Sequence, residues 1–200
     1  ADSAAEAFNA TVMTTSADWL VWVHQDVYLP AGWNTQFALR LQQAQARWPQ
    51  LAVAGVYGVR GQSDLAQHVG HVLDRGTLLA PPVPLPCLAD SLDELLVAVR
   101  VSSGLQMDPA LGFDFYGTDL VLQAQAKGMS CAVVDAYCEH WSDTPNQRPL
   151  PSTLTQRIEK NAEAFEKKWV HKLPITTTCF DIRQPGDVAA FLSNRGITIV

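Results

Sequence analysis

The sequence predicts an α/β domain, because short runs of apolar residues alternate with amphipathic helical segments along the chain. Strand-like runs occur at Trp19–Val23, Leu51–Val59 and Ser130–Ala136. Apolar residues recur at three- and four-residue spacing from Asn34 to Trp48, as on one face of a helix. A chain of 200 residues, of which 48% are hydrophobic and 17% charged, can bury one substantial core. We therefore expect a mixed sheet flanked by helices, with a C-terminal helical extension.

The first half of the chain supplies one short and one long helix. An Ala-rich segment at Ala4–Met13 favours a short helix whose Phe8 packs inward. The Trp19–Val23 run follows as a buried strand. The segment Asn34–Trp48 then has a single apolar face, and Pro49 stops it. Helix and strand thus alternate from the start of the chain.

A hairpin is expected in the middle of the chain. The segments His68–Leu73 and Thr77–Leu79 flank Asp74-Arg75-Gly76, whose composition is typical of a tight turn. We expect His68 and His71 within it to be surface or packing residues rather than ligands.

Residues 91–101 allow two interpretations. Ser91-Leu92-Asp93-Glu94 has the pattern of a helix capping box. The residues that follow, Leu95–Val101, are rich in Val, which suits a strand better. We favour the strand.

The next helix is expected to begin at Thr118, an N-cap residue type, and to end before Gly128. The apolar run Ser130–Ala136 then forms another buried strand. This strand leads into a polar segment that contains Glu139 and His140.

A long amphipathic helix is predicted at Ser152–Trp169, after a Pro-rich link. From His171 onward the pattern is a weak strand and helix. We therefore divide the chain into a domain at residues 1–150 and a C-terminal helix and tail at residues 151–200.

Composition narrows the classes of partner and compartment. The net charge is −6 and no block of Lys or Arg is present, so nucleic acid is not expected as a partner. The four cysteines form no Cys-x-x-Cys pair, which favours reduced structural thiols. No apolar run reaches the roughly 18 residues of a membrane span, and no signal peptide is recognisable. We expect a cytoplasmic protein without a transmembrane segment.

Three separated element ends each present a polar residue suited to metal-assisted chemistry. Asp26 follows the Trp19–Val23 strand, Asp119 opens a helix, and His140 follows another strand. A carboxylate and an imidazole can hold a divalent cation, while a second carboxylate acts as a base. Each residue also has a simpler interpretation: Asp26 in a turn, Asp119 at a helix dipole, and His140 on the surface.

In order and context these motifs resemble the family 2 glycosyltransferases of the GT-A fold, over roughly residues 3–142. The string His24-Gln25-Asp26 resembles the Asp-x-Asp motif of that family, whose last acid binds the metal. Asp26 is therefore implied as a metal ligand, and His140 as its partner. His24 replaces the first acid, and the resemblance places it with Gln25 and Asp26 at the nucleotide sugar. Tyr116-Gly117-Thr118-Asp119 resembles the motif of the catalytic base, which implies that role for Asp119.

The resemblance implies a metal-dependent, inverting transfer of a sugar to an acceptor hydroxyl. The expected donor is a nucleotide sugar, most simply a UDP-sugar, the expected cofactor Mn²⁺ or Mg²⁺, and the expected acceptor a saccharide or a lipid-linked acceptor. Trp33 and Trp141 could stack on sugar rings, although ordinary packing explains them equally well. Asp114 and Tyr116 could contact acceptor hydroxyls.

The family begins with a β-α-β-α-β half that holds the nucleotide base, whereas this sequence opens at the helix before the metal-motif strand. We therefore expect a partial GT-A-like (Rossmann-like) domain that lacks the first β-α-β units. A half-built sheet would expose an apolar edge, which would lower stability or recruit a partner.

Two other functions remain open. A degenerate GT-A scaffold could bind a nucleotide, a metal or a protein partner without catalysis, as the altered positions His24 and Thr118 favour. A metal-dependent hydrolase could use His24, Asp26, Asp119 and His140, but such sites usually need more clustered ligands. Fold alone does not decide among them.

Overall fold

The computed structural model describes residues 3–142 and 150–195 and confirms a mixed α/β architecture. The helices are α1 (Ala4–Thr14), α2 (Trp33–Arg47), α3 (Tyr116–Ala126), α4 (Ser152–Trp169) and α5 (Asp187–Arg195). The strands of the central sheet are β1 (Trp19–Val23), β3 (Leu51–Gly55), β8 (Cys87–Leu88), β10 (Leu96–Arg100) and β11 (Ser130–Val133). The remaining strands are β2 (Val27–Tyr28), β4 (Tyr57–Arg60), β5 (Gln67–Gly70), β6 (Val72–Asp74), β7 (Thr77–Leu79), β9 (Ser91–Leu92), β12 (Cys138–His140), β13 (Ile175–Thr176) and β14 (Asp181–Ile182).

The central sheet has the order β1-β10-β3-β11-β8. Strand β10 is antiparallel to both β1 and β3, while β11 is parallel to β3. Strands β1, β3 and β11 therefore run in one direction, with one reversed strand between β1 and β3. The Val-rich segment predicted as a strand is confirmed as β10.

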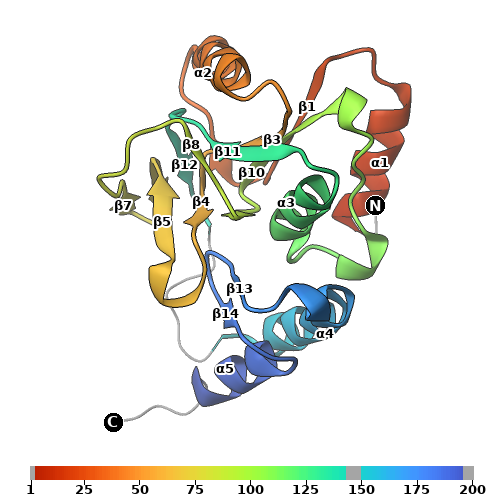
Figure 1. The fold of residues 1–200 in the computed structure, drawn as a ribbon. Helices are drawn as coiled ribbons and strands as arrows, with labels where there is room; N and C mark the ends of the chain where they lie inside the picture. The colour runs from red at the N-terminus through yellow and green to blue at the C-terminus, as the bar shows by residue number, and fades with distance from the viewer. Residues whose placement is uncertain (1–2, 143–149, 196–200) are drawn as a thin grey trace.

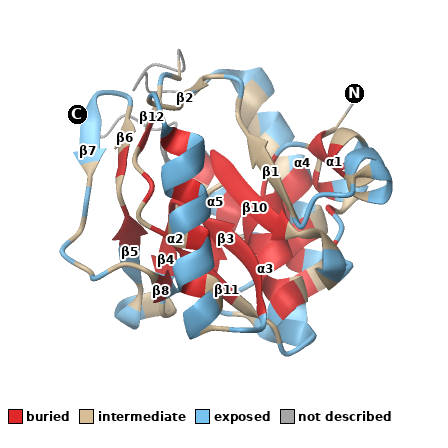
Figure 2. Ribbon diagram, turned by 90° about the horizontal axis from the view of Figure 1, so that it is seen from above, coloured by how far each residue is buried: buried red, intermediate tan, exposed pale blue. Residues whose placement is uncertain are grey.

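Side-chain alternation divides the core between the two faces of this sheet. Val53 and Val97 pack with α1 and α3 on one face, whereas their neighbours Ala54 and Leu96 pack with α2 on the other. Figure 1 shows α2 on one side of the sheet and α3 on the opposite side. Figure 2 shows the central strands buried and the outward side of α2 exposed, as its single apolar face predicts.

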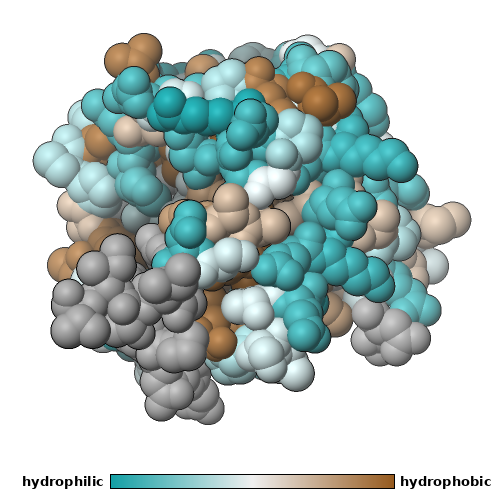
Figure 3. Space-filling view, turned by 90° about the horizontal axis from the view of Figure 1, so that it is seen from below, coloured by the Kyte–Doolittle hydropathy of each residue, from teal (hydrophilic) through white to brown (hydrophobic). Residues whose placement is uncertain are grey.

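The C-terminal segment forms a further layer. Helices α4 and α5 and the β13–β14 hairpin share an apolar cluster with Leu111, Phe115 and Leu122 from the earlier part of the chain. The predicted limits of the long helix, Ser152–Trp169, are confirmed. Figure 3 views the molecule from this side, and its surface is mostly hydrophilic with apolar groups in small separate areas. No described helix is both long enough and apolar enough to span a bilayer.

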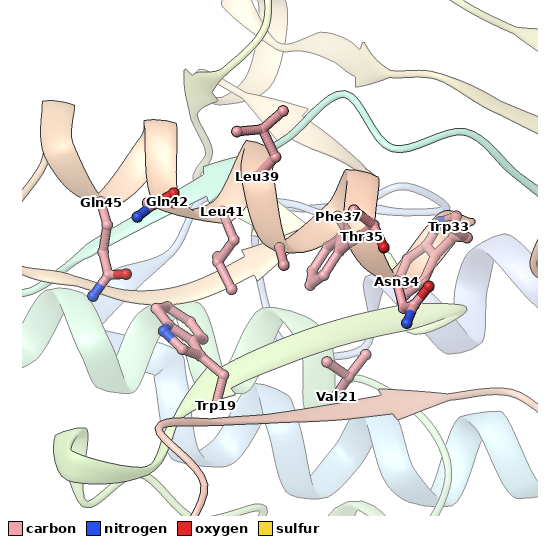
Figure 4. A pocket seen from close by; sticks show the side chains of 11 residues that line it. Trp19, Val21, Trp33, Asn34, Thr35, Phe37, Leu39, Leu41, Gln42 and Gln45 are labelled. Atoms are coloured by element: carbon pink, nitrogen blue, oxygen red, sulfur yellow. The ribbon is translucent and has the colours of Figure 1, made fainter.

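Strand β1 lies at the edge of the central sheet, and no described strand pairs with its outer side. Its five residues are half-buried rather than buried, which corrects the expectation of a fully buried strand. A shallow groove separates β1 from α2. Figure 4 shows Trp19 and Val21 of β1 facing Phe37 and Leu41 of α2 across this groove.

The predicted central hairpin is confirmed only in its second part. Val72–Asp74 pairs with Thr77–Leu79, but Gln67–Gly70 pairs with β4 in another sheet. Gly70 separates the two parts, because its φ of 139° and its closeness to the Val56 carbonyl exclude a side chain there.

The start of α3 also differs from the prediction. The helix begins at Tyr116, after Phe115 in a left-handed conformation with φ 65°, and Thr118 is not its N-cap. The Thr118 hydroxyl instead lies 2.7 Å from the Ser91 hydroxyl in the interior. The backbone N–H groups of Phe115 and Gly117 donate to the carboxyl group of Glu94, so a residue distant in sequence caps this helix.

Candidate metal centre

The end of β1 delivers two potential ligands into a tight turn. The His24 N–H donates to the Leu95 carbonyl at 3.0 Å, and the Val27 N–H donates back to the His24 carbonyl at 3.2 Å. Strand β2 then pairs with β12 so that Val27 lies opposite His140. The Trp141 N–H closes the arrangement by donating to the Asp26 carbonyl at 2.8 Å. Backbone pairing thus brings Asp26 and His140 together although they are far apart in the sequence.

His24, Asp26 and His140 each offer one ligand atom, and these three atoms lie within 4.8 Å of one another. The imidazole rings of His24 and His140 are 5.9 Å apart. His140 Nε2 lies 3.4 Å from Asp26 Oδ1, which is within ion-pair range but does not meet hydrogen-bond geometry. We refer to these three residues as the triad.

Asp74 fixes the orientation of His140. The parallel pairing of β6 with β12 places Asp74 beside His140, and His140 Nδ1–H donates to Asp74 Oδ1 at 2.8 Å. This leaves Nε2 facing Asp26, the arrangement in which a carboxylate supports a metal-binding imidazole. The hydrogen bond to Asp74 is the main reason that the pKa of His140 is raised above 6.5. Burial acts to raise the pKa of Asp74, but bonds from His140 and Arg75 outweigh it and lower that pKa.

Tyr116 fixes the tautomer of His24. The Tyr116 hydroxyl donates to the Glu94 carbonyl at 2.9 Å and lies 2.8 Å from His24 Nε2. Since the hydroxyl proton is already used, His24 Nε2 must donate its own proton to the hydroxyl oxygen. Nδ1 then carries the free lone pair of the neutral ring. Burial is the main cause that lowers the pKa of His24, which favours this neutral form.

One oxygen of Asp26 is the clearest sign of a ligand site. Oδ1 is buried and accepts no hydrogen bond from any residue that the structure describes. A buried carboxylate oxygen without a partner is costly, and such atoms in native proteins often mark ion sites. Two imidazole nitrogens and one carboxylate oxygen form a mixed donor set, which suits a divalent transition metal better than Mg²⁺. The residues present therefore fit a metal ion.

Asp119, the predicted catalytic base, lies in a different environment. Its side chain is fully buried, and Lys168 Nζ lies 2.7 Å from Oδ1. Trp169 Nε1 donates to the same oxygen at 2.8 Å, and Gln123 Nε2 donates to Oδ2 at 2.6 Å. Both oxygens thus have partners from α3 and α4. This geometry is that of a structural ion pair, and the role of catalytic base stays a prediction for Asp119.

The residues predicted to contact the nucleotide sugar or the acceptor lie partly in the interior and partly on the surface. Asp114 is held by two hydrogen bonds from Arg157, at 2.9 and 3.0 Å, and one from Asn161 at 2.6 Å. Trp33 is buried and stacks on Phe37 with ring centroids 4.6 Å apart, so the packing alternative holds for it. Gln25 is exposed in the turn before β2.

Tyr116 and Trp141 meet the triad in different ways. The Tyr116 ring is buried and its hydroxyl bonds to His24, so the structure makes it a positioning residue rather than a surface contact. Trp141 is exposed beside His140. His71 lies near the surface, 3.1 Å from Asp135, as expected for a residue outside the site.

Asp74 and Glu94 were missed as contributors to the site. In the sequence Asp74 has the signature of a turn residue, and nothing local indicates that β6 runs parallel to β12. Glu94 fits the capping-box pattern, but it caps α3 rather than a helix of its own. In both cases the acidic residue type could have suggested a polar contact. Nothing in the sequence indicated which residue the acid would contact.

Comparison with known proteins gives a distant relative. No protein-family model matches the chain. The chain is 28% identical over 162 residues to a protein of Fuscovulum blasticum described as "ATP synthase subunits region ORF 6". The match covers 76% of this chain and 60% of that relative, so the chain spans less than two thirds of the relative's length.

Proposed function

We propose that this chain is part of a glycosyltransferase-like protein that binds a divalent metal and a nucleotide sugar at the His24, Asp26 and His140 triad. The observation that carries the proposal is the meeting of these three residues around a buried carboxylate oxygen of Asp26 that accepts no hydrogen bond from the described residues. They are the residues that the resemblance to family 2 glycosyltransferases relates to the metal and the donor. The reaction proposed is inverting transfer of the sugar to an acceptor hydroxyl.

The sheet order supports the corresponding fold proposal. Three parallel strands with one reversed strand between β1 and β3 suit a GT-A-like mixed sheet. The triad lies just beyond the carboxyl end of β1, the position at which α/β sheets bind ligands.

Each residue of the triad has a proposed task. Asp26 supplies the negative charge, and Nδ1 of His24 and Nε2 of His140 supply neutral lone pairs. Asp74 and Tyr116 hold the two imidazoles in the required tautomers. When bound, a divalent cation such as Mn²⁺ supplies Lewis-acid stabilisation of the leaving diphosphate. The mixed donor set is why we propose Mn²⁺ ahead of Mg²⁺.

A second candidate function is a scaffold that binds metal and nucleotide without catalysis. The observation that favours it is the burial of Asp119, both of whose oxygens are engaged by Lys168, Trp169 and Gln123. In that arrangement Asp119 cannot take a proton from an acceptor. A glycosyltransferase and a non-catalytic scaffold would both bind metal and nucleotide. Only a measurement of turnover distinguishes them.

Calorimetric titration with UDP, with and without Mn²⁺, tests the shared part of the proposal. We expect binding that requires Mn²⁺ and disappears in Asp26→Ala. The matched control is Asp135→Ala, which removes a carboxylate paired with another histidine, His71, at 3.1 Å. Equal binding by wild type and Asp26→Ala would refute the triad as the site. Incubation with UDP-hexoses and release of UDP then distinguishes an enzyme from a binding scaffold.

A further inference from the structure

Two partly exposed aromatic rings stack on each other beside the triad. Tyr28 of β2 and Trp141, which follows β12, stack with centroids 4.8 Å apart and planes inclined by 8°. Tyr28 is 44% exposed and Trp141 is 58% exposed. We name this pair the aromatic platform. Contiguous exposed apolar surface can mark a binding site, whereas single exposed apolar side chains are normal, so the pairing of the two rings is the relevant feature.

Polar contacts at the edges of the two rings hold the platform in place. Trp141 Nε1–H donates to Glu139 Oε2 at 2.8 Å, and the Tyr137 hydroxyl donates to Glu139 Oε1 at 3.0 Å. The backbone register places Glu139 directly opposite Tyr28. Because the indole N–H already has a partner, the remaining exposed surface of Trp141 is its apolar ring. A ring fixed before binding loses little conformational entropy when a ligand stacks on it.

The platform is continuous with the triad. The Trp141 N–H donates to the Asp26 carbonyl at 2.8 Å, and Val27, beside Tyr28, lies opposite His140. A molecule stacked on the rings would therefore lie next to whatever the triad binds. This is the position expected for the second substrate of a transfer reaction.

The charges around the platform select among possible occupants. Glu139 supports the indole, and Asp26, Asp74 and Asp135 lie on the neighbouring turns and strands. Arg75 pairs with Asp74 at 3.0 Å and offsets one of these charges, while the remaining carboxylates disfavour an acidic sugar on the rings. A neutral pyranose fits them, because its apolar C–H face stacks on an aromatic ring while its hydroxyls can donate to carboxylate oxygens.

We propose that the aromatic platform of Tyr28 and Trp141 binds a pyranose ring of a neutral saccharide acceptor. The word acceptor rests on the proposed function, whereas saccharide binding does not. The proposal narrows the acceptor class from a saccharide or a lipid-linked acceptor to a neutral sugar.

The test follows Trp141 directly by ¹⁹F NMR of the chain labelled with 5-fluorotryptophan. The chain has six Trp residues, and the Trp141 resonance is identified by its loss in Trp141→Phe. The probes are cellobiose, maltose and N,N′-diacetylchitobiose, which are neutral pyranose disaccharides. The controls are sorbitol, an acyclic polyol, and UMP. Trp48, half-buried beside Arg47 at the end of α2, is the internal reference.

We expect at least one disaccharide to shift Trp141 saturably while Trp48 stays unchanged. Tyr28→Ser should weaken that binding at least about tenfold in the same spectra, the scale of losing an aromatic stacking partner. Trp141→Ser has no Trp141 resonance, so its affinity for the same disaccharide is measured by calorimetric titration, and we expect a loss of the same size. Thermal unfolding of both variants verifies that they fold. No response to any of the three disaccharides, or an equal response to sorbitol, would overturn the proposal. A response to UMP alone would make the platform a nucleobase site and overturn it as well.

The outcome is separable from that of the proposed function. Titration of the wild-type chain with UDP and Mn²⁺ reports on the triad alone. Saccharide binding without UDP binding would support a carbohydrate site and refute the nucleotide-sugar proposal. UDP binding without saccharide binding would support the nucleotide-sugar proposal and refute the saccharide site.

Discussion

Asp26 and Asp119 are two carboxylates in contrasting environments. Asp119 is fully buried, and both its oxygens are bonded to side chains of α3 and α4. Asp26 has a buried oxygen that accepts no hydrogen bond from a described residue, and it faces two histidines. The first environment stabilises a charge with protein groups alone. The second leaves one carboxylate oxygen without a hydrogen-bond donor from the described residues, which is why we propose a metal there.

Burial and charge alone do not distinguish a functional acid from a structural one. The hydrogen bonds and ion pairs of each carboxylate oxygen must also be known. A carboxylate whose bonds are complete contributes to folding, and one whose bonds are incomplete contributes to binding. Removal of each acid should therefore have opposite consequences for stability and for ligand affinity.

The largest effect is expected from Asp119→Ala. This change leaves Trp169, Gln123 and Lys168 without their shared acceptor, and breaking a buried pair costs about 3–5 kcal/mol of the free energy of unfolding. Urea unfolding measures it. The control is Asp108→Ala, which removes the more exposed partner of Lys168 and a turn cap at a cost of about 1 kcal/mol. Unchanged stability together with lost turnover would restore Asp119 as a catalytic base.

Asp26→Asn should have little effect on stability and a large effect on ligand binding. The free energy of unfolding should change by no more than about 1 kcal/mol, because Oδ1 makes no hydrogen bond that can be lost. Mn²⁺-dependent UDP binding should weaken at least about 100-fold, the upper end of what loss of a supporting residue costs a metal site. Urea unfolding and calorimetry on the same sample measure both quantities. A large loss of stability with unchanged affinity for UDP and Mn²⁺ would show that Asp26, like Asp119, has a structural role.

Asp74→Asn isolates the support of His140. We expect Mn²⁺ affinity to fall about 10- to 100-fold, because the amide holds the imidazole less firmly than the carboxylate does. Asp135→Asn is the matched control, since Asp135 pairs with His71 at 3.1 Å but lies outside the triad. Equal losses in both variants would show a nonspecific effect of charge.

The smallest effect is a pH dependence set by His140. Its pKa is raised above 6.5, chiefly by the bond to Asp74, so without metal its contribution to stability is complete below about pH 6.5 and declines as pH rises through the raised pKa. Mn²⁺ competes with that proton, so its affinity should rise over the same interval, by at most about tenfold per pH unit. Imidazole NMR and calorimetry across this interval measure the two effects.

Asp74→Asn should move the transition of His140 to lower pH, because it removes the main cause of the raised pKa. The pKa of His24 is shifted in the opposite direction to that of His140. Its lowered pKa means that its contribution to stability is present above pH 6.5 and declines as pH falls through the lowered pKa. A triad whose two histidines titrate together would contradict the assigned tautomers.

The sequence was most informative where structure depends on local periodicity. The limits of α4, Ser152–Trp169, were predicted correctly because its apolar residues recur along one continuous helix face. The strand β10 followed from its Val content against a competing capping-box pattern. The start of α3 was predicted wrongly, since its cap comes from Glu94 in another loop.

The residue types of the candidate metal centre, and their place at the ends of β1 and β12, could be predicted from the sequence alone. This was possible because hydrophobic strands end in polar residues that are readable in order. Only the tertiary structure decided which acids are available, by turning Asp119 toward Lys168 and by pairing β6 in parallel with β12 so that Asp74 supports His140. The physical reason is that a carboxylate is defined chemically by its partners, and those partners are chosen by packing between segments distant along the chain.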